Sequence, residues 1–212
     1  MEKSKINYQS ILDAELASIT AQGITPRLLL HACCAPCSSY VLEYLTRYFD
    51  ITVYFYNPNI TDAAEYKKRL DELSRLISIM PHENQITLVE GEFSPERFYA
   101  FTGGLESLPE GGARCFSCYR ERLEATARYM SKYKGQYDYF ATTLTVSPHK
   151  NAAKLNELGA ELADKYGIKW LASDFKKREG YKRSIELSRE YGLYRQDFCG
   201  CEFSRDYKYG NN

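Results

Sequence analysis

Short apolar segments alternate with longer helical segments along almost the whole sequence, and this order restricts the fold more than any other feature. Residues 27–32 form an apolar run without polar alternation, which is typical of a strand buried in a parallel sheet. Further strands are expected at residues 51–56, 86–89, 137–142 and 168–171. Helices are expected at residues 8–21, 36–49, 62–80, 115–134, 148–166 and 181–191, with another opening at 94. The alternation predicts an α/β fold with one open, mostly parallel sheet of about five strands and helices on both faces.

The domain organisation is expected to be simple. The chain has 212 residues, a length that suits one α/β domain, and it contains no repeat, low-complexity tract or convincing linker. We expect residues 1–24 to form an N-terminal helical extension that packs on a single domain at residues 25–212.

Composition narrows the class of protein and the chemistry of its cysteines. Lys and Arg number 28, as do Asp and Glu, so the net charge of zero does not itself indicate a nucleic-acid partner. No segment approaches the roughly 20 apolar residues that span a bilayer, and the N-terminus lacks the features of a secretory signal. We therefore expect a cytoplasmic protein with no membrane association. In that reducing compartment seven cysteines favour metal ligands or catalytic thiols over disulfides.

The seven cysteines fall into three groups. They are Cys33, Cys34 and Cys37; Cys115 and Cys118; and Cys199 and Cys201. The first group lies where the first strand ends, and the second lies where a helix begins. Both positions belong to the edge at which open α/β sheets bind ligands, so we expect these groups to share one rim with the C-terminal segment folded over it. Helix N-termini also favour the thiolate form that binds metal.

Three kinds of site are compatible with these thiols. Cys115, Cys118, Cys199 and Cys201 would suit structural zinc, which leaves the first group unexplained. Cys34 and Cys37 form the C-x-x-C of a thiol–disulfide oxidoreductase, which ignores the other two groups. An iron–sulfur cluster with additional metal ligation accommodates all seven thiols. The grouping indicates metal without identifying which one.

The first strand–helix turn argues against nucleotide chemistry. Enzymes of similar strand–helix order that use ATP place a Gly- or Ser-rich loop there, whose backbone N–H groups bind phosphate. Here the turn is Cys-Cys-Ala-Pro-Cys, and Pro36 has no N–H to donate. We expect no use of ATP.

Several longer motifs resemble one known family. They are His31-Ala-Cys-Cys-Ala-Pro-Cys37, Tyr56-Asn-Pro-Asn-Ile60, Glu65-Tyr66 with Arg69, Cys115-x-x-Cys118-Tyr-x-x-Arg122-Leu123, Thr142-Thr-Leu-Thr-Val-Ser-Pro-His-Lys150, Asp174-Phe-Lys-Lys177, Gly180-Tyr-Lys-Arg-Ser184 and Tyr194-Arg-x-x-Phe-Cys-Gly-Cys201. Together these blocks span about residues 27–205 and resemble the QueH-type epoxyqueuosine reductases. They are far more specific than a single C-x-x-C.

The resemblance implies an activity and its cofactors. The activity would be reduction of epoxyqueuosine in the tRNA anticodon wobble position to queuosine, by an oxidoreductase with a [4Fe–4S] cluster and an additional mononuclear iron. Residues 25–212 would be the metal-binding catalytic domain, related to the ATP-pyrophosphatase/HUP superfamily but without ATP chemistry. An external electron donor would supply the two electrons. On this resemblance we assign Cys34, Cys115, Cys118 and Cys199 to the cluster, and Cys33, Cys37 and Cys201 to the iron.

Other polar residues are candidates for the site. His149 and Lys150 follow the strand at 137–142, and are expected to contact substrate or donate a proton rather than face solvent at a helix start. Asp174 follows residues 168–171 and is either an active-site acid or metal ligand, or a helix cap. Asn57 and Asn59 either fix a turn or shape the pocket. His31 is expected to be a buried, hydrogen-bonded histidine.

A basic run near the C-terminus is the candidate surface for tRNA. It contains Lys176, Lys177, Arg178, Lys182 and Arg183, and residues 169–212 hold ten basic and seven acidic side chains. Although such a run is commonly a solvated face, a tRNA substrate would make it a phosphate contact. Tyr181, Tyr191 and Tyr194 are placed to stack on unpaired bases.

Overall fold

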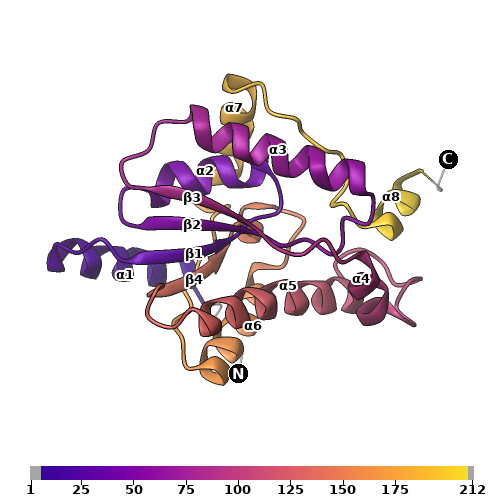
Figure 1. Cartoon of the computed structure of the whole chain (residues 1–212), viewed down its shortest axis with the longest axis horizontal. Coiled ribbons are helices and arrows are strands. Elements are labelled where there is room, and N and C mark those ends of the chain that lie inside the picture. Colours follow the sequence, from indigo (N-terminus) through magenta and orange to yellow (C-terminus); the bar gives the residue numbers. More distant parts are fainter. Residues whose placement is uncertain (1–5, 210–212) are drawn as a thin grey trace.

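Four parallel strands form the central sheet of the computed structural model, which describes residues 6–209. They are β1 (Arg27–His31), β2 (Asp50–Phe55), β3 (Ile86–Glu90) and β4 (Tyr139–Thr142). Their order across the sheet is β3-β2-β1-β4, and every pair is parallel (Figure 1). The chain moves from β1 to β2 and β3 on one side, whereas β4 pairs with β1 on the other. Strand order therefore reverses beside β1, and open α/β sheets bind ligands at the carboxyl ends of strands at such a reversal.

Helices cover both faces of the sheet (Figure 1). Helices α1, α2 and α3 pack on one face with α7 against α2, and α5 and α6 pack on the other. The bounds are α1 Tyr8–Gln22, α2 Ala35–Leu45, α3 Ala63–Ile79, α4 Pro95–Thr102, α5 Ala113–Lys132, α6 Ala152–Tyr166, α7 Gly180–Glu190 and α8 Glu202–Tyr209. This arrangement confirms the α/β fold class expected from the sequence. None of the helices within residues 6–209 is long and apolar enough to cross a membrane.

The core divides into two clusters because successive strand residues point to opposite faces of the sheet. In β1, Leu28 and Leu30 pack with α1, α2 and α3, whereas Leu29 packs with α5 and α6. Helix α1 contributes Leu12 and Leu16 to the first cluster, so its apolar face shares the core of the sheet. The ends of the expected segments 1–24 and 25–212, residues 1–5 and 210–212, lie outside the described residues.

The fifth expected strand, at residues 168–171, is a single parallel bridge between Phe140 and Trp170. The side chain of Asn156 explains why pairing goes no further. Its Nδ2 donates to the Ser173 carbonyl at 2.8 Å, and its Oδ1 accepts from the Ser173 N–H at 3.0 Å. An amide on α6 thus satisfies the backbone groups that a longer strand would have paired.

The segment after β4 also differs from the expected helix at 148–166. A short 3₁₀ helix, η1 (Thr143–Val146), follows the strand, and α6 begins only at Ala152. Asn151 caps α6, because its side chain accepts a hydrogen bond from the Lys154 N–H at 3.0 Å. The loop between η1 and α6 therefore carries His149 and Lys150 at the carboxyl edge of the sheet.

Candidate metal centre and active site

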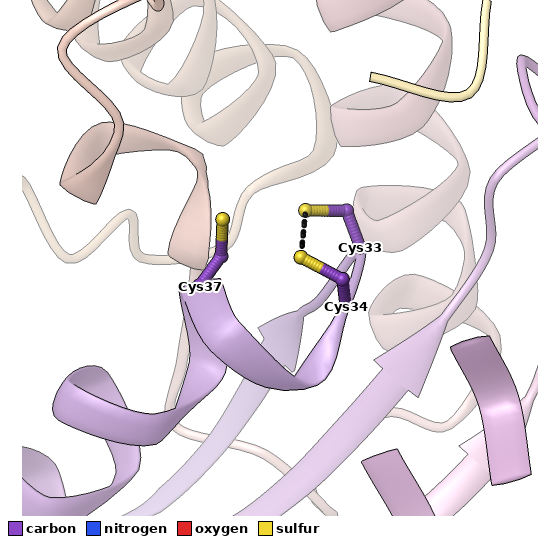
Figure 2. Close-up of side chains that lie close together, drawn as sticks. All are labelled: Cys33, Cys34 and Cys37. Carbon is purple, nitrogen blue, oxygen red and sulfur yellow. Dashed lines mark hydrogen bonds between the residues drawn. The ribbon is translucent and has the colours of Figure 1, made fainter. Parts of the chain in front are cut away.

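Three thiols lie together where β1 ends and α2 begins (Figure 2). The sulfurs of Cys33, Cys34 and Cys37 are all within 4.8 Å of one another, and Cys33 Sγ is 3.6 Å from Cys34 Sγ. Cys34 is extended and precedes the first turn of α2, in which Pro36 starts the helix and Cys37 follows. The turn thereby directs three sulfurs toward one another, a donor set that could hold a metal ion.

The three thiols differ in their pKa values. Hydrogen bonds from the Cys34 and Cys37 thiols hold the pKa of Cys33 well below its ordinary value. Donation to Cys33 raises the pKa of Cys34 to about 12, and donation to both neighbours raises that of Cys37 well above its ordinary value. Cys33 is therefore the most acidic thiol of the three, and a metal ion bound by all three sulfurs would displace the protons that they carry.

The second cysteine group lies at the start of α5. Cys115 lies in the first turn of α5, and the backbone N–H of Gly111, just before the helix, donates to Cys115 Sγ at 3.2 Å. Cys118 follows one turn later, and burial raises the pKa of its thiol. Arg122, one further turn along the helix, places its Nη1 4.0 Å from Cys118 Sγ. Helical spacing of three and four residues aligns these groups on one face.

The third group is held in place by side chains far from it in sequence. Asn59 Nδ2 donates to the Cys199 carbonyl at 3.0 Å, and Arg69 Nη2 donates to the Phe198 carbonyl at 3.3 Å. Gly200 has a positive φ of 95°, and a Cβ there would lie 2.6 Å from Ile60 Cγ1. Only glycine fits this turn without displacing its neighbours. The C-terminal segment is thereby tied to α3 and its preceding loop.

Cys199 is an acidic thiol. A hydrogen bond from the Cys201 thiol, together with the nearby Lys150 ammonium, lowers the pKa of Cys199 to about 5 despite burial. The same interaction and burial raise the pKa of Cys201. Each of the first and third groups therefore has one thiol with a lowered pKa beside thiols with raised pKa values, and a lowered pKa favours the form that binds metal.

A buried polar network lies beneath the thiols. Arg122 is 3 % exposed, and its Nη2 donates to Asn57 Oδ1 at 2.6 Å while its Nε lies 3.3 Å from His31 Nε2. Asn57 in turn donates to the Ala32 carbonyl at 2.9 Å. His31 Nδ1 is 2.9 Å from Thr142 Oγ1. Burial and the Arg122 charge lower the pKa of His31 to about 3, so this histidine is neutral, buried and hydrogen-bonded, as expected from the sequence.

A cavity of about 240 Å³ opens beside these groups. Its lining includes Cys33, Cys37 and Cys199, so it touches both the first and third cysteine groups. The polar part of the lining consists of Arg69, Glu110, Arg122, Ser147, His149, Lys150, Tyr181, Ser184, Arg195, Gln196, Asp197 and Ser204. A small ligand in this space would meet thiols and several cationic side chains.

The pair after β4 lies at this cavity. Lys150 has a side chain only 10 % exposed, and its Nζ is 3.2 Å from Glu110 Oε1. Burial lowers the pKa of Lys150, but Cys199, Tyr119 and Glu110 outweigh it and the pKa lies above its ordinary value. Burial raises the pKa of Glu110, yet the Lys150 charge outweighs that effect and the pKa is lowered. His149 is exposed and also lines the cavity.

Asp174 lies elsewhere. Its carboxylate is 2.7 Å from Lys176 Nζ and is not part of the cavity lining. Asn57 and Asn59 are both fully buried and bind backbone carbonyls, so they shape the site through the loop after β2. The structure thus brings His149 and Lys150 to the thiols and leaves Asp174 in an ion pair outside the cavity.

The basic run borders the cavity, since Tyr181 and Ser184 of α7 line it. Most of its cations have carboxylate partners: Lys176 pairs with Asp174, Arg178 with Asp13, Lys182 with Glu179, and Arg183 with Glu43. Lys177 is exposed and has no ion pair within the described part of the chain. The run is therefore less positive in the fold than its sequence indicates.

Sequence reasoning did not assign a role to several residues that form the site. Arg122 was visible only as part of a motif, although its i,i+4 spacing from Cys118 places both on one helix face. Glu110 lies in a Gly-rich loop that carries no recognisable pattern. Arg195 and Gln196 lie in the segment before the third cysteine group, and the Gln196 side-chain oxygen is buried without a hydrogen-bond partner.

Comparisons with known proteins agree on one family. A family model described as epoxyqueuosine reductase QueH matches residues 28–207. A Staphylococcus epidermidis protein named epoxyqueuosine reductase QueH is 42 % identical over 208 residues, covering 96 % of this chain and 87 % of that protein. A protein of the same name from Thermotoga maritima is 36 % identical, covering 84 % of this chain and 89 % of that protein. The matched residues include all three cysteine groups.

The fold also has a likeness among solved structures. An NMN synthetase from Francisella tularensis aligns with a TM-score of 0.46 and 12 % identity, covering 97 % of this chain and 81 % of that chain. A likeness at this level carries no functional conclusion.

Proposed function

The chain belongs to the QueH family of epoxyqueuosine reductases, and on this premise we propose that it reduces epoxyqueuosine in the anticodon wobble position of tRNA to queuosine. The observation that carries the proposal is the cavity beside Cys33, Cys34 and Cys37, into which Arg122 and Lys150 also reach. Family membership supplies the substrate, and the thiols and cations supply a place for reductive chemistry. We place this activity in the cytoplasm, with an external electron donor.

The thiols fit the metals that this proposal includes, a [4Fe–4S] cluster and a further iron. Thiolates about 2.3 Å from one tetrahedral ion lie about 3.8 Å apart, which suits the tight group of Cys33, Cys34 and Cys37. Ligands of a cluster bind different irons and need wider spacing. The other four thiols, Cys115, Cys118, Cys199 and Cys201, provide four such ligands.

We therefore propose a partition that differs from the assignment made on the resemblance. Cys34 joins Cys33 and Cys37 at the single iron, because its sulfur lies within 4.8 Å of both. Cys201 joins the cluster group, because its thiol hydrogen-bonds to Cys199 and Cys118 is near enough to raise its pKa. Sulfur spacing supports this division, which the cysteine variants described in the Discussion test.

The reaction itself sets what the site must supply. Removing an epoxide oxygen breaks two C–O bonds, leaves an alkene and releases water, which consumes two electrons and two protons. Iron held by these cysteines would supply single-electron transfer and Lewis-acid chemistry toward oxygen. The external donor restores the electrons. ATP has no part in the proposal, because thiols and Pro36 occupy the turn where a phosphate loop would lie.

The chain's own residues supply charge and protons. Lys150 Nζ and the Arg122 guanidinium hold positive charge at the cavity, where negative charge develops on the departing oxygen. The ion pair with Glu110 fixes the direction of the Lys150 side chain. His149 is exposed at the same lining, so its imidazole can transfer protons from solvent to that oxygen.

Metal analysis tests the proposal most directly. Protein prepared anaerobically is expected to be brown and to contain about five irons per chain, four in the cluster and one beside it, with little zinc. Metal content and an absorbance spectrum are measured together with epoxyqueuosine reduction. Stoichiometric zinc with full activity would contradict the proposal and favour a structural zinc site. Activity without any metal would instead favour a dithiol mechanism through Cys34 and Cys37.

Binding of tRNA through the basic run gives a second prediction. Changing Lys176, Lys177 and Lys182 together to Gln is expected to weaken tRNA binding and leave iron content unchanged, because phosphate contacts set affinity. Each lost contact removes about 0.7 to 0.9 from the slope of log K against log salt, so the slope should fall by up to about 2 to 3. The measurement is tRNA affinity over a series of salt concentrations.

A matched triple variant controls for charge alone. Lys132, Lys134 and Lys165 are exposed and lie at the ends of α5 and α6, away from the carboxyl edge of the sheet. Changing these three to Gln alters net charge equally and is expected to leave the slope nearly unchanged. If the two triple variants changed the salt slope equally, the basic run would be an ordinary solvated face and not the tRNA contact.

A further inference from the structure

Arg122 is a buried cation without a carboxylate partner. Its side chain is 3 % exposed, yet no ion pair with Asp or Glu reaches it within the described residues. Its neighbours are Asn57 Oδ1 at 2.6 Å, His31 Nε2 at 3.3 Å and Cys118 Sγ at 4.0 Å. Two other largely buried cations at the cavity differ, since Arg69 pairs with Glu65 and Lys150 with Glu110.

Such a charge requires compensation. An isolated charge in a protein interior is strongly destabilising unless it is paired. Burial lowers the pKa of Arg122, but the nearby sulfurs of Cys118 and Cys33 outweigh it and the pKa lies above its ordinary value. Asn57 and the neutral His31 offer no negative charge. Among the atoms that Arg122 contacts, Cys118 Sγ is therefore the one that can carry a negative charge.

The position of Arg122 lets it act on both cysteine groups of the cavity. It projects from α5 past Cys118, and it lines the same cavity as Cys33 and Cys199. One fixed cation thus contacts a thiol proposed for the cluster, Cys118, and lines the same cavity as a thiol proposed for the single iron, Cys33.

We propose that Arg122 is a positioning residue that sets the reduction potential of the iron–sulfur centre by compensating thiolate charge from within the protein. This inference rests on the proposed function, because it requires that centre. Adding an electron makes the centre more negative, so a nearby cation stabilises the reduced form more than the oxidised form. Little solvent screens the interaction at a buried position. Arg122 therefore raises the potential and makes the centre easier to reduce.

A purely structural role is the alternative that the experiment has to separate. Arg122 also holds Asn57, which binds the Ala32 carbonyl just before Cys33. Loss of these hydrogen bonds could shift the first cysteine group without any effect of charge. Arg122→Lys and Arg122→Gln both remove the planar guanidinium contacts, but only the lysine variant keeps the charge.

The experiment compares these two variants with wild type and with Arg120→Gln. Arg120 lies on the same helix, is half-buried and pairs with Glu161 rather than with a thiol, so its loss removes one positive charge elsewhere on the helix. Iron content is measured first, and the midpoint potential is then obtained by redox titration followed by absorbance. We expect a more negative potential in Arg122→Gln, a smaller shift in Arg122→Lys and none in Arg120→Gln.

Each outcome decides the inference. An unchanged potential in iron-loaded Arg122→Gln would overturn it, as would equal shifts in the Gln and Lys variants. Iron loading by Arg122→Lys but not by Arg122→Gln would support it, because charge alone separates the two. Failure of both variants to load iron would assign Arg122 a structural role. A wild-type protein without an iron–sulfur centre would instead refute the proposed function itself.

Discussion

Replacing Cys118 with alanine is expected to abolish both the iron–sulfur absorbance and the turnover of epoxyqueuosine. Cys118 is assigned to the cluster whether the thiols are divided by the resemblance or by sulfur spacing. It lies on α5 beside Arg122, and Cys199 of the third group is near enough to raise the pKa of its thiol. Removing this sulfur deletes an anchoring ligand and leaves the buried guanidinium without its nearest counter-charge. We expect a loss of activity of more than about 100-fold. Such a loss exceeds the effect of replacing a residue that only supports a metal ligand.

Iron content, visible absorbance and turnover measure this result on anaerobically purified protein. Ser117→Ala is the matched control, since it alters the neighbouring residue of the same helix without removing a thiol. The control should retain iron and activity. A Cys118→Ala protein with wild-type iron content and turnover would contradict the cluster site at α5.

The sequence predicted those parts of the site that depend on local order along the chain. The turn of Cys33, Cys34 and Cys37 follows from a strand that ends before a helix opened by proline, so its place at the sheet edge required no tertiary information. His149 and Lys150 follow β4 for the same reason. Alternating strands and helices likewise gave the fold class.

Features that depend on distant partners were not predictable. The basic run reads as positive in sequence, but Arg178 pairs with Asp13 and Arg183 with Glu43, both more than a hundred residues away. The fifth strand is limited to one bridge because Asn156 binds the backbone of Ser173. Neither a neutralising carboxylate nor a competing amide is visible in a local pattern.

Arg122 illustrates the same limit within the site. Its spacing from Cys118 is visible in the sequence, but many exposed helix arginines have equal spacing from some cysteine. Burial against Asn57 and His31 without a carboxylate is what gives it a role, and that depends on how β1, β2 and α5 meet. Charge compensation is a property of the packed interior rather than of the helix.

Replacing Cys37 with alanine is expected to remove turnover while leaving the cluster spectrum. Cys37 lies in the first turn of α2 with its sulfur toward Cys33 and Cys34, and it lines the cavity (Figure 2). If these three thiols hold the single iron, loss of one leaves two protein ligands for that ion. The cluster keeps all of its ligands. We expect about one iron fewer per chain and a loss of activity of at least about 100-fold.

Cys37→Asp and Cys34→Ala sharpen this test. Aspartate keeps an anionic ligand atom at position 37, so this variant should retain more of the single iron, and more turnover, than Cys37→Ala. Cys34→Ala discriminates between the two divisions of the thiols. Sulfur spacing predicts that it behaves like Cys37→Ala and keeps the cluster spectrum, because Cys34 lies within 4.8 Å of both partners. Loss of that spectrum in Cys34→Ala, with its retention in Cys201→Ala, would restore the division made on the resemblance and place Cys34 among the ligands of the cluster.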